Sequence, residues 1–242
     1  MKRYVILIVS LFTVALTFYL MFHPVGWMSV WDISDKYFTS ITPIWYTFSI
    51  WMLIYIAWIS LWLLNAFKIE KVSWHYIALS WAIISILGWI IAWQLEYFFL
   101  SLVFDSICLY LLFSTYLYKE NKKYFEAVLE IFLWWMLVSW LATLHIFLLA
   151  QGWYFSPLFL TIFSLSIWIC VTLFYVFYKD THLQVFVYFW ALQWIFTQQE
   201  SIIIRCIILF NIITVSLALI INKYITKYQI KSIKPFKILK WK

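Results

Sequence analysis

The sequence predicts an all-α integral membrane protein, a bundle of about eight transmembrane helices with both termini in the cytoplasm. Three observations support this fold class. Of the 242 residues, 67% are hydrophobic and 11% are charged, which is more apolar surface than a soluble core can bury. The apolar runs have the length of helices, and Gly and Pro occur only 3 and 4 times, which favours helices over barrel strands. Lys and Arg also fall almost entirely on one side of the predicted spans.

Each predicted span is an apolar run of about 17 to 25 residues, the length that covers the hydrocarbon layer. We expect one polytopic domain over 1–222 with spans at about 4–23, 42–66, 74–94, 97–118, 128–150, 157–178, 184–199 and 202–222. The first run is long for a secretory signal and no small-residue cleavage site follows it, so we expect an uncleaved helix. The seventh run is the shortest. Short connections should make sequential helices antiparallel neighbours.

Basic residues test the number of spans independently of hydropathy. With a cytoplasmic N-terminus, the inner side holds fifteen of them: Lys2, Arg3, Lys68, Lys71, Lys119, Lys122, Lys123, Lys179 and seven lysines in 223–242. The outer segments hold only Lys36. This bias is typical of cytoplasmic loops, and removing one span would place the basic tail outside. We therefore predict eight spans in a bacterial inner membrane and a cytoplasmic tail at 223–242, which suits anionic headgroups better than nucleic acid.

No motif of a soluble enzyme occurs in the chain. A phosphate-binding glycine loop, an HExxH pair and a nucleophile elbow are all missing. Cys108, Cys170 and Cys206 lie within predicted helices without the spacing of a disulfide framework or a zinc site. We therefore expect no catalytic residues, no metal and no required cofactor, and an enzyme is the less favoured class.

One face of the predicted second helix carries aromatic rings at positions i, i+3, i+7, i+10 and i+14: Phe48, Trp51, Tyr55, Trp58 and Trp62. Anchoring rings would lie at the two ends of a span, whereas these continue through its depth. Large rings hold helices apart, so this face predicts one wall of a cavity for a flat apolar ligand. Trp89 and Trp93 could form a second wall and Trp190 a third. The alternative is that the rings only fill space between helices.

Few ionisable groups lie within the spans. Asp105 is about eight residues into the fourth span, roughly 12 Å deep, where a carboxylate must be paired, hydrated or protonated. We expect it to serve either a ligand or a structural partner. His145 should lie in the same layer, as a ligand contact or as a hydrogen-bonded core imidazole. Arg205 is expected to reach the surface or to pair with Glu200.

The segment PIWYTFSIWMLIY, residues 43–55, resembles the second helix of the TspO/MBR family, the tryptophan-rich sensory proteins related to the translocator protein. Pro43, Trp45, Trp51 and Tyr55 match its spacing, and the Phe-Ser-Ile-Trp segment is similar to the longer bacterial branch. WIIAWQLEYFFLS and YFWALQW are similar to further parts of that branch. The chain departs from the family at His145, near an expected asparagine, and in having three spans beyond the five of shorter members.

The resemblance implies a helical bundle that binds porphyrins, other tetrapyrroles or similar flat molecules, in a sensory or regulatory role. We expect the partners to be the lipid bilayer and a hydrophobic small molecule, with a homodimer as a further state and no nucleic acid. Two alternatives stay open: a transporter of a small amphipathic molecule, and an intramembrane enzyme for a lipid or pigment with Asp105 and His145 as acid and base. The predicted ligand-binding residues are Pro43, Trp45, Phe48, Trp51, Tyr55, Trp58, Trp89, Trp93, Asp105, His145 and Trp190.

Overall fold

The computed structural model describes residues 2–42, 45–66, 74–117, 123–153, 156–178 and 183–227. Pro43, the side chain of Trp45 and the end of the basic tail lie outside the described residues. All regular structure within the described ranges is helical, which confirms the predicted all-α class. The helices are α1 (Lys2–Phe22), α2 (Val30–Lys36), η1 (Trp45–Ser49, a 3-10 helix), α3 (Ile50–Ala66), α4 (Trp74–Gln94), α5 (Phe98–Leu117), α6 (Lys123–Ala150), α7 (Pro157–Tyr178), α8 (Leu183–Gln198) and α9 (Ile202–Lys227).

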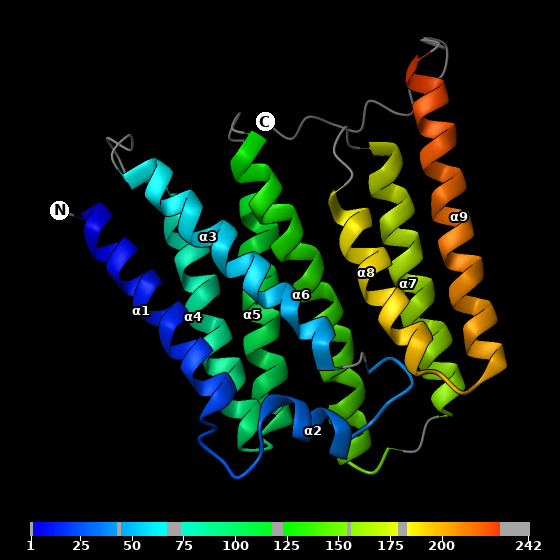
Figure 1. Ribbon diagram of the computed structural model, residues 1–242, viewed down its shortest axis with the longest axis horizontal. Helices are drawn as coiled ribbons and strands as arrows, with labels where there is room; N and C mark the ends of the chain where they lie inside the picture. Colours follow the sequence, from blue (N-terminus) through cyan, green and yellow to red (C-terminus); the bar gives the residue numbers. More distant parts are fainter. Residues whose placement is uncertain are drawn as a thin grey trace.

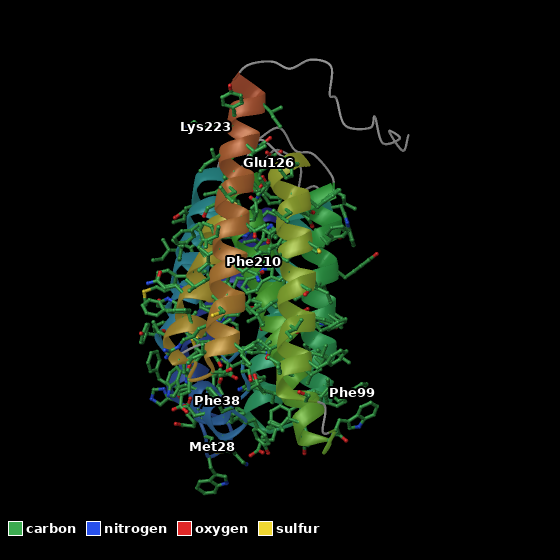
Figure 2. All side chains as sticks on the ribbon, turned by 90° about the vertical axis from the view of Figure 1, so that its right-hand side faces the viewer. Met28, Phe38, Phe99, Glu126, Phe210 and Lys223 are labelled. Atoms are coloured by element: carbon green, nitrogen blue, oxygen red, sulfur yellow. The ribbon has the colours of Figure 1, made fainter. Side chains whose placement is uncertain are left out.

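The long helices alternate in direction along the chain (Figure 1). The start of α1 and the end of α9 lie at the same end of the molecule, and α2 lies across the opposite end, which we call the α2 end. Met28 and Phe38 lie at the α2 end, whereas Glu126 and Lys223 lie at the other (Figure 2). This antiparallel arrangement follows from the short connections between helices.

Six of the described helices are long and apolar enough to cross a bilayer: Tyr46–Leu63, Tyr76–Gln94, Phe98–Leu117, Phe125–Ala150, Leu158–Phe177 and Ile202–Ile225. The apolar part of α1, Leu7–Phe22, is shorter, and α8 has 16 residues. The protein therefore has the architecture of a multi-pass membrane protein. The predicted count of eight spans would require both shorter helices to cross as well.

Two groups of helices can be distinguished by their contacts. In the N-terminal bundle (α1–α6), α4 packs on α1 and α5, and α6 packs on α3 and α5. In the C-terminal group (α7–α9), α7 packs on α9 and α8. The two groups meet mainly where α8 lies against α6 and η1.

Helix α8 and the residue that follows it, Gln199, also hold η1 and the segment before it. Trp190 Nε1 donates to the carbonyl of Thr47 at 3.4 Å, and Gln199 Nε2 donates to the carbonyl of Ser40 at 2.5 Å. The ring of Trp194 packs edge-on against Tyr46 with centroids 4.3 Å apart. The predicted second span, 42–66, is therefore two elements, because its first turns form the 3-10 helix η1 under α8.

The short helix α2 begins with a capping box. The Ser29 hydroxyl accepts from the Asp32 N–H at 3.2 Å, and the Asp32 carboxylate accepts from the Ser29 N–H at 2.9 Å. These two bonds satisfy donors that the first turn of a helix leaves free. The sequence analysis missed α2 because it is short and carries three charges, although the Ser-x-x-Asp spacing is the signal of such a start.

The turn between α4 and α5 contacts the C-terminal end of α2. Glu96 has a left-handed backbone (φ 60°), its N–H donates to Trp93 and the next N–H donates to Ala92, both at 2.9 Å. This pattern ends a helix and usually has glycine in the left-handed position. The Glu96 carboxylate accepts from Lys36 at 2.8 Å and from the Tyr37 hydroxyl at 2.5 Å. Glu96, whose backbone conformation is unfavourable for a residue other than glycine, thus holds the end of α2 through its carboxylate.

Candidate functional site

Four tryptophans from three helices surround a small cavity near the α2 end, which we call the aromatic cavity. Trp51 of α3, Trp89 and Trp93 of α4 and Trp135 of α6 line it. Phe48 of η1, Thr42 and Ser34 of α2 complete the lining on the side of the α2 end, and the cavity volume is about 30 Å³. That volume has room for one or two water molecules.

Helical spacing explains why these rings meet. Trp89 and Trp93 are four residues apart and share one face of α4, with ring centroids 5.4 Å apart. The ring of Trp51 lies 6.1 Å from Trp89 and 6.2 Å from Trp135, so it is the centre of the group. All four side chains are buried. The rings pack in tilted and T-shaped pairs, and these leave a small unfilled space between the three helices.

A buried carboxylate lies behind the aromatic cavity. Asp105 of α5 is fully buried, and its Oδ2 accepts from Thr143 Oγ1 at 2.8 Å and from Ser139 Oγ at 3.2 Å. Both hydroxyls also line the cavity, and Trp89 Nε1 donates to Thr143 Oγ1 at 3.4 Å. A continuous series of hydrogen bonds therefore connects an indole of the cavity wall to Asp105.

Asp105 is hydrogen-bonded by hydroxyl donors and is not paired with a basic side chain among the described residues. Across the residues that the structure describes, the ion pair between Lys36 and Glu96 is the only one. Arg205 lies elsewhere, exposed, with its guanidinium 5.7 Å from the centre of the Phe196 ring. The described side chains also include no group of three or more His, Cys, Asp or Glu that could hold a metal.

The rest of the predicted stripe on α3 packs away from the aromatic cavity. Tyr55 and Trp58 are buried further along the helix and do not line the cavity. The Trp58 ring contacts Trp62 at 6.0 Å, and Trp62 contacts Tyr76 of α4 at 5.3 Å. Only the first part of the stripe, Phe48 and Trp51, lines the cavity, and the remainder lies in the helix-packing core.

His145 and Trp190 lie apart from the aromatic cavity. His145 shares a hydrogen bond of 2.8 Å with Ser164 of α7, because it projects from the face of α6 opposite to Thr143. It lines a different cavity of about 280 Å³ with Phe38 and Trp153. Trp190 packs on other rings of α8 and bonds to the backbone of η1.

The structure adds three residues to the site that the sequence analysis did not select: Trp135, Ser139 and Thr143. They are four residues apart and lie on one face of α6. A search for polar residues sharing a helical face with a tryptophan would have found them. The pairing with Asp105 depends on the rotation of α6 about its axis, which spacing within one helix does not reveal.

Outside the spans, hydrogen bonds set the pKa of two acids at the α2 end. Donation from Lys36, and then from Tyr37, holds the pKa of Glu96 below its ordinary value. Donation from the Ser29 hydroxyl and N–H lowers the pKa of Asp32 in the same way. Both acids are therefore charged at neutral pH; Asp32 caps the start of α2, and Glu96 attaches the end of α2 to the turn between α4 and α5.

Comparison with known proteins gives one match. The model of a family described as "TSPO-like protein" matches residues 3–221, from α1 to α9, and so covers both helix groups. No curated protein and no solved structure matches the chain.

Proposed function

Because the chain belongs to the TSPO-like protein family, we propose that it binds a flat hydrophobic molecule, a porphyrin or another tetrapyrrole, at the aromatic cavity. The family match confirms the resemblance carried by residues 43–55. Membership makes the chain a membrane protein of the TspO kind, and the ligand, its site and its sensory or regulatory use are the proposal.

The observation that supports the proposal is the convergence of four indoles with a hydroxyl-bound carboxylate. Trp51, Trp89, Trp93 and Trp135 provide flat apolar surface, and Ser139 and Thr143 present hydroxyls to the same space. Ligand sites typically combine an apolar wall with a few such polar groups. Asp105 orients both hydroxyls and thereby fixes which way their remaining hydrogen-bonding capacity points.

A tetrapyrrole needs far more room than the aromatic cavity of about 30 Å³. The proposal therefore requires the lining at the α2 end to move. Its polar contacts with α4 and the turn after it are those of the Glu96 carboxylate with Lys36 and Tyr37, and of Trp93 Nε1 with the Val30 carbonyl at 3.1 Å. Displacing α2 breaks these contacts and also uncovers the buried side chains of Val30 and Ile33.

In the proposed membrane topology α1 and α8 also cross, which gives eight spans with both ends in the cytoplasm of a bacterial cell. The distribution of Lys and Arg and the common end of α1 and α9 support it. The α2 end is then the outer end, so the aromatic cavity would open away from the cytoplasm.

Transport is the second candidate function, and Asp105 is the observation that favours it. A buried carboxylate within spans is typical of proton-coupled pathways. Substrate flux into proteoliposomes that disappears in Asp105→Asn would support it. The structure gives less support to the enzyme alternative, in which Asp105 and His145 act together as acid and base. Asp105 bonds to Thr143 of α6, whereas His145 bonds to Ser164 of α7.

The test is a titration of the purified protein with protoporphyrin IX, followed by the absorbance of the porphyrin. Trp51→Phe should weaken binding by up to about tenfold, the size of one aromatic contact of 0.5–1.5 kcal/mol. The control is Trp81→Phe, because Trp81 is 56% exposed and points away from the bundle. Equal affinities in the two variants, or binding that never saturates, would rule out the aromatic cavity as the site.

A further inference from the structure

Two hydroxyls lie between the Asp105 carboxylate and the aromatic cavity. Ser139 and Thr143 both line the cavity, and each donates its one hydrogen to Asp105 Oδ2, Thr143 at 2.8 Å and Ser139 at 3.2 Å. A hydroxyl has one donor position and two acceptor positions. While Asp105 is ionised, both hydroxyls already use their donor, so they can only accept a hydrogen bond from a molecule in the cavity.

Protonation of Asp105 reverses this arrangement. A protonated carboxyl group becomes a donor, and Ser139 and Thr143 are the partners that the structure gives it. The hydroxyl that accepts this bond has its own hydrogen free again. For Thr143 the reversal is complete, because Trp89 Nε1 donates to its other acceptor position at 3.4 Å. The same cavity then offers a hydrogen-bond donor where it offered an acceptor.

The other titratable groups around Asp105 are either distant or lose their protons at higher pH. Cys108 is one turn further along α5 and interacts with Asp105, and Tyr55 of α3 interacts with Cys108. Thiols and phenols lose their protons at higher pH than carboxyl groups do. The helices packed most closely on α5 are α4 and α6. Apart from His145, which bonds to α7, their titratable residues lie in the half of the bundle away from the α2 end (Figure 1): His75, Tyr76, Lys123, Tyr124, Glu126 and Glu130.

We propose that Asp105 determines which ligands the aromatic cavity binds, through the donor or acceptor character that it imposes on Ser139 and Thr143. With Asp105 ionised, the cavity selects flat molecules that carry an N–H or O–H. With Asp105 protonated, it selects flat molecules that carry a carbonyl. Asp105 is a positioning residue, since it bonds to the hydroxyls that meet the ligand. The inference rests on the proposed function, because a flat molecule must enter the cavity, but it does not require that molecule to be a tetrapyrrole.

Carbazole and fluorenone are matched probes for this selection. Both are flat, tricyclic and uncharged, and carbazole has an N–H donor where fluorenone has a carbonyl acceptor. The affinities of tritium-labelled probes are measured over a series of pH values with full-length protein in lipid nanodiscs, and binding to empty nanodiscs is subtracted. The infrared band of a protonated carboxyl group that is lost in Asp105→Asn shows where Asp105 titrates. Above that pH carbazole should be preferred by about 3- to 10-fold, and below it fluorenone by a similar factor.

Three variants test the role of the hydrogen bonds. Asp105→Asn cannot change its charge, so its preference between the probes should be the same at every pH. Thr143→Val removes the hydroxyl whose character reverses completely and should reduce the pH dependence. The matched control is Thr172→Val, because Thr172 is also buried but donates to the Trp168 carbonyl of its own helix at 2.8 Å. This variant should keep the pH dependence of the wild type.

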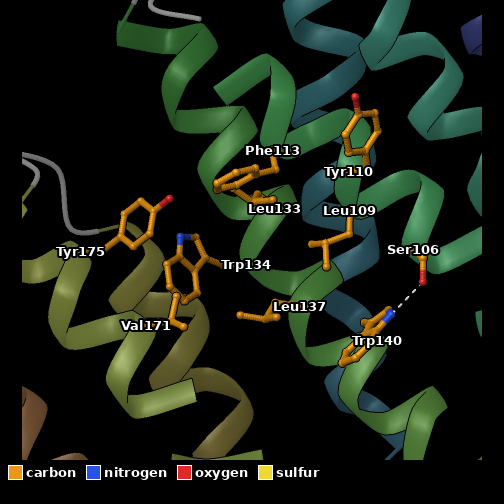
Figure 3. Close-up of a pocket in the computed structure, with 10 residues that line it drawn as sticks. All are labelled: Ser106, Leu109, Tyr110, Phe113, Leu133, Trp134, Leu137, Trp140, Val171 and Tyr175. Atoms are coloured by element: carbon orange, nitrogen blue, oxygen red, sulfur yellow. Dashed lines mark hydrogen bonds between the residues drawn. The ribbon is translucent and has the colours of Figure 1, made fainter. Parts of the chain in front are cut away.

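A larger space between α5, α6 and α7 can also take apolar probes, and its contribution is measured separately. This α5–α7 groove has a volume of about 420 Å³ (Figure 3). Among the described residues that line it, none carries a carboxyl group or an imidazole. The indole of Trp140 points to Ser106 and donates to its hydroxyl at 2.9 Å, drawn as a dashed line in Figure 3. Leu137→Trp, which fills the groove, should therefore leave the pH-dependent preference unchanged.

The proposal is overturned if the preference between carbazole and fluorenone is the same at every pH, or if it changes equally in Asp105→Asn. Loss of the pH dependence in Leu137→Trp would place the probes in the groove and would overturn it too, as would the failure of both probes to bind. The proposed function is judged separately with protoporphyrin IX. A cavity that distinguishes the two probes but does not bind the porphyrin would refute the tetrapyrrole ligand and support the role of Asp105.

Discussion

Helices α4 and α6 of the N-terminal bundle and helices α7 and α9 of the C-terminal group are all apolar enough to cross a membrane, but they differ in how much of that sequence they bury; α5 of the bundle, with 33%, resembles α7. In α4, 67% of the window Tyr76–Gln94 is buried, and in α6, 56% of Phe125–Ala150. The corresponding shares are 33% in α7 and 28% in α9. Most of α9 therefore faces outward, and the core of the molecule lies around α4 and α6.

Polar bonds between helices occur in both regions but involve different groups. In the bundle, hydroxyls of α6 bond across to the buried Asp105 carboxylate of α5. In the C-terminal helices, the Tyr188 hydroxyl donates to Asn211 Oδ1 at 2.7 Å, and Asn222 Nδ2 donates to the Val176 carbonyl at 2.9 Å. The bonds to Asp105 lie beside the aromatic cavity, so they bear on its geometry, whereas those of the C-terminal helices do not.

The largest expected contrast is between Trp58→Ala and Trp190→Ala. Trp58 is fully buried, so its truncation should lower the free energy of unfolding by about 3–5 kcal/mol. Trp190 is half-buried, and the loss there should be clearly smaller. Thermal unfolding in one detergent would measure both. If the two variants lose equal stability, the C-terminal helices are as tightly packed as the bundle.

A smaller contrast is expected for threonine hydroxyls. Thr143→Val removes the shortest bond to the buried Asp105 carboxylate and should destabilise the protein by about 1–3 kcal/mol. Thr214→Val makes the same chemical change where the hydroxyl bonds only its own helix, and it should be nearly neutral. Unfolding curves of the two variants, run side by side, give the difference. Equal effects would mean that the hydrogen bonds to Asp105 add no stability.

The smallest expected effect is the loss of stability at low pH when Glu96 no longer holds the end of α2. The ordinary pKa of Glu96 is 4.5, and its folded pKa is lower because Lys36 and Tyr37 donate to it. This stabilisation is present above the unfolded pKa and is lost as the pH falls through the folded pKa. Glu96→Gln should therefore flatten the fall in melting temperature below pH 4.5.

The control for that measurement is Glu200→Gln. Glu200 is exposed, and the described residues offer it no ion pair. Its substitution should leave the acid dependence as in the wild type. A Glu96→Gln profile that follows the wild type at every pH would show that the contact with α2 contributes nothing.

Hydropathy located the long helices well, because a span must be apolar over a fixed length. The range 74–94 is that of α4, and the last helix continues to Lys227 because a helix need not end where the hydrocarbon does. The helix α2 was missed because nothing in a polar segment of seven residues marks it except its capping box. Length and hydropathy thus predict the positions of the long helices, because the bilayer requires those helices to be apolar over a fixed length.

The arrangement of the site was only partly predictable. The spacing on α3 correctly indicated an inward face, but spacing does not tell a cavity from close packing, and Trp58 lies in packing. Depth placed Asp105 and His145 in one layer, whereas the rotation of α6 sends Thr143 toward Asp105 and His145 toward Ser164. The neighbour that each face of a helix meets depends on the assembled bundle, so it cannot be predicted from the sequence of that helix alone.

Two hydrogen bonds join residues that are synthesised late to residues that are synthesised early. They link Thr47 to Trp190 across 143 positions and Ser40 to Gln199 across 159 positions. Contacts so distant in sequence carry a loop-closure cost. The lining of the aromatic cavity and the contact of Glu96 with Lys36 need none of the residues of α8, so this part of the fold can form on the ribosome before α8 exists. A chain that stops before Leu183 would therefore keep the lining and lose the two hydrogen bonds that hold Ser40 and η1.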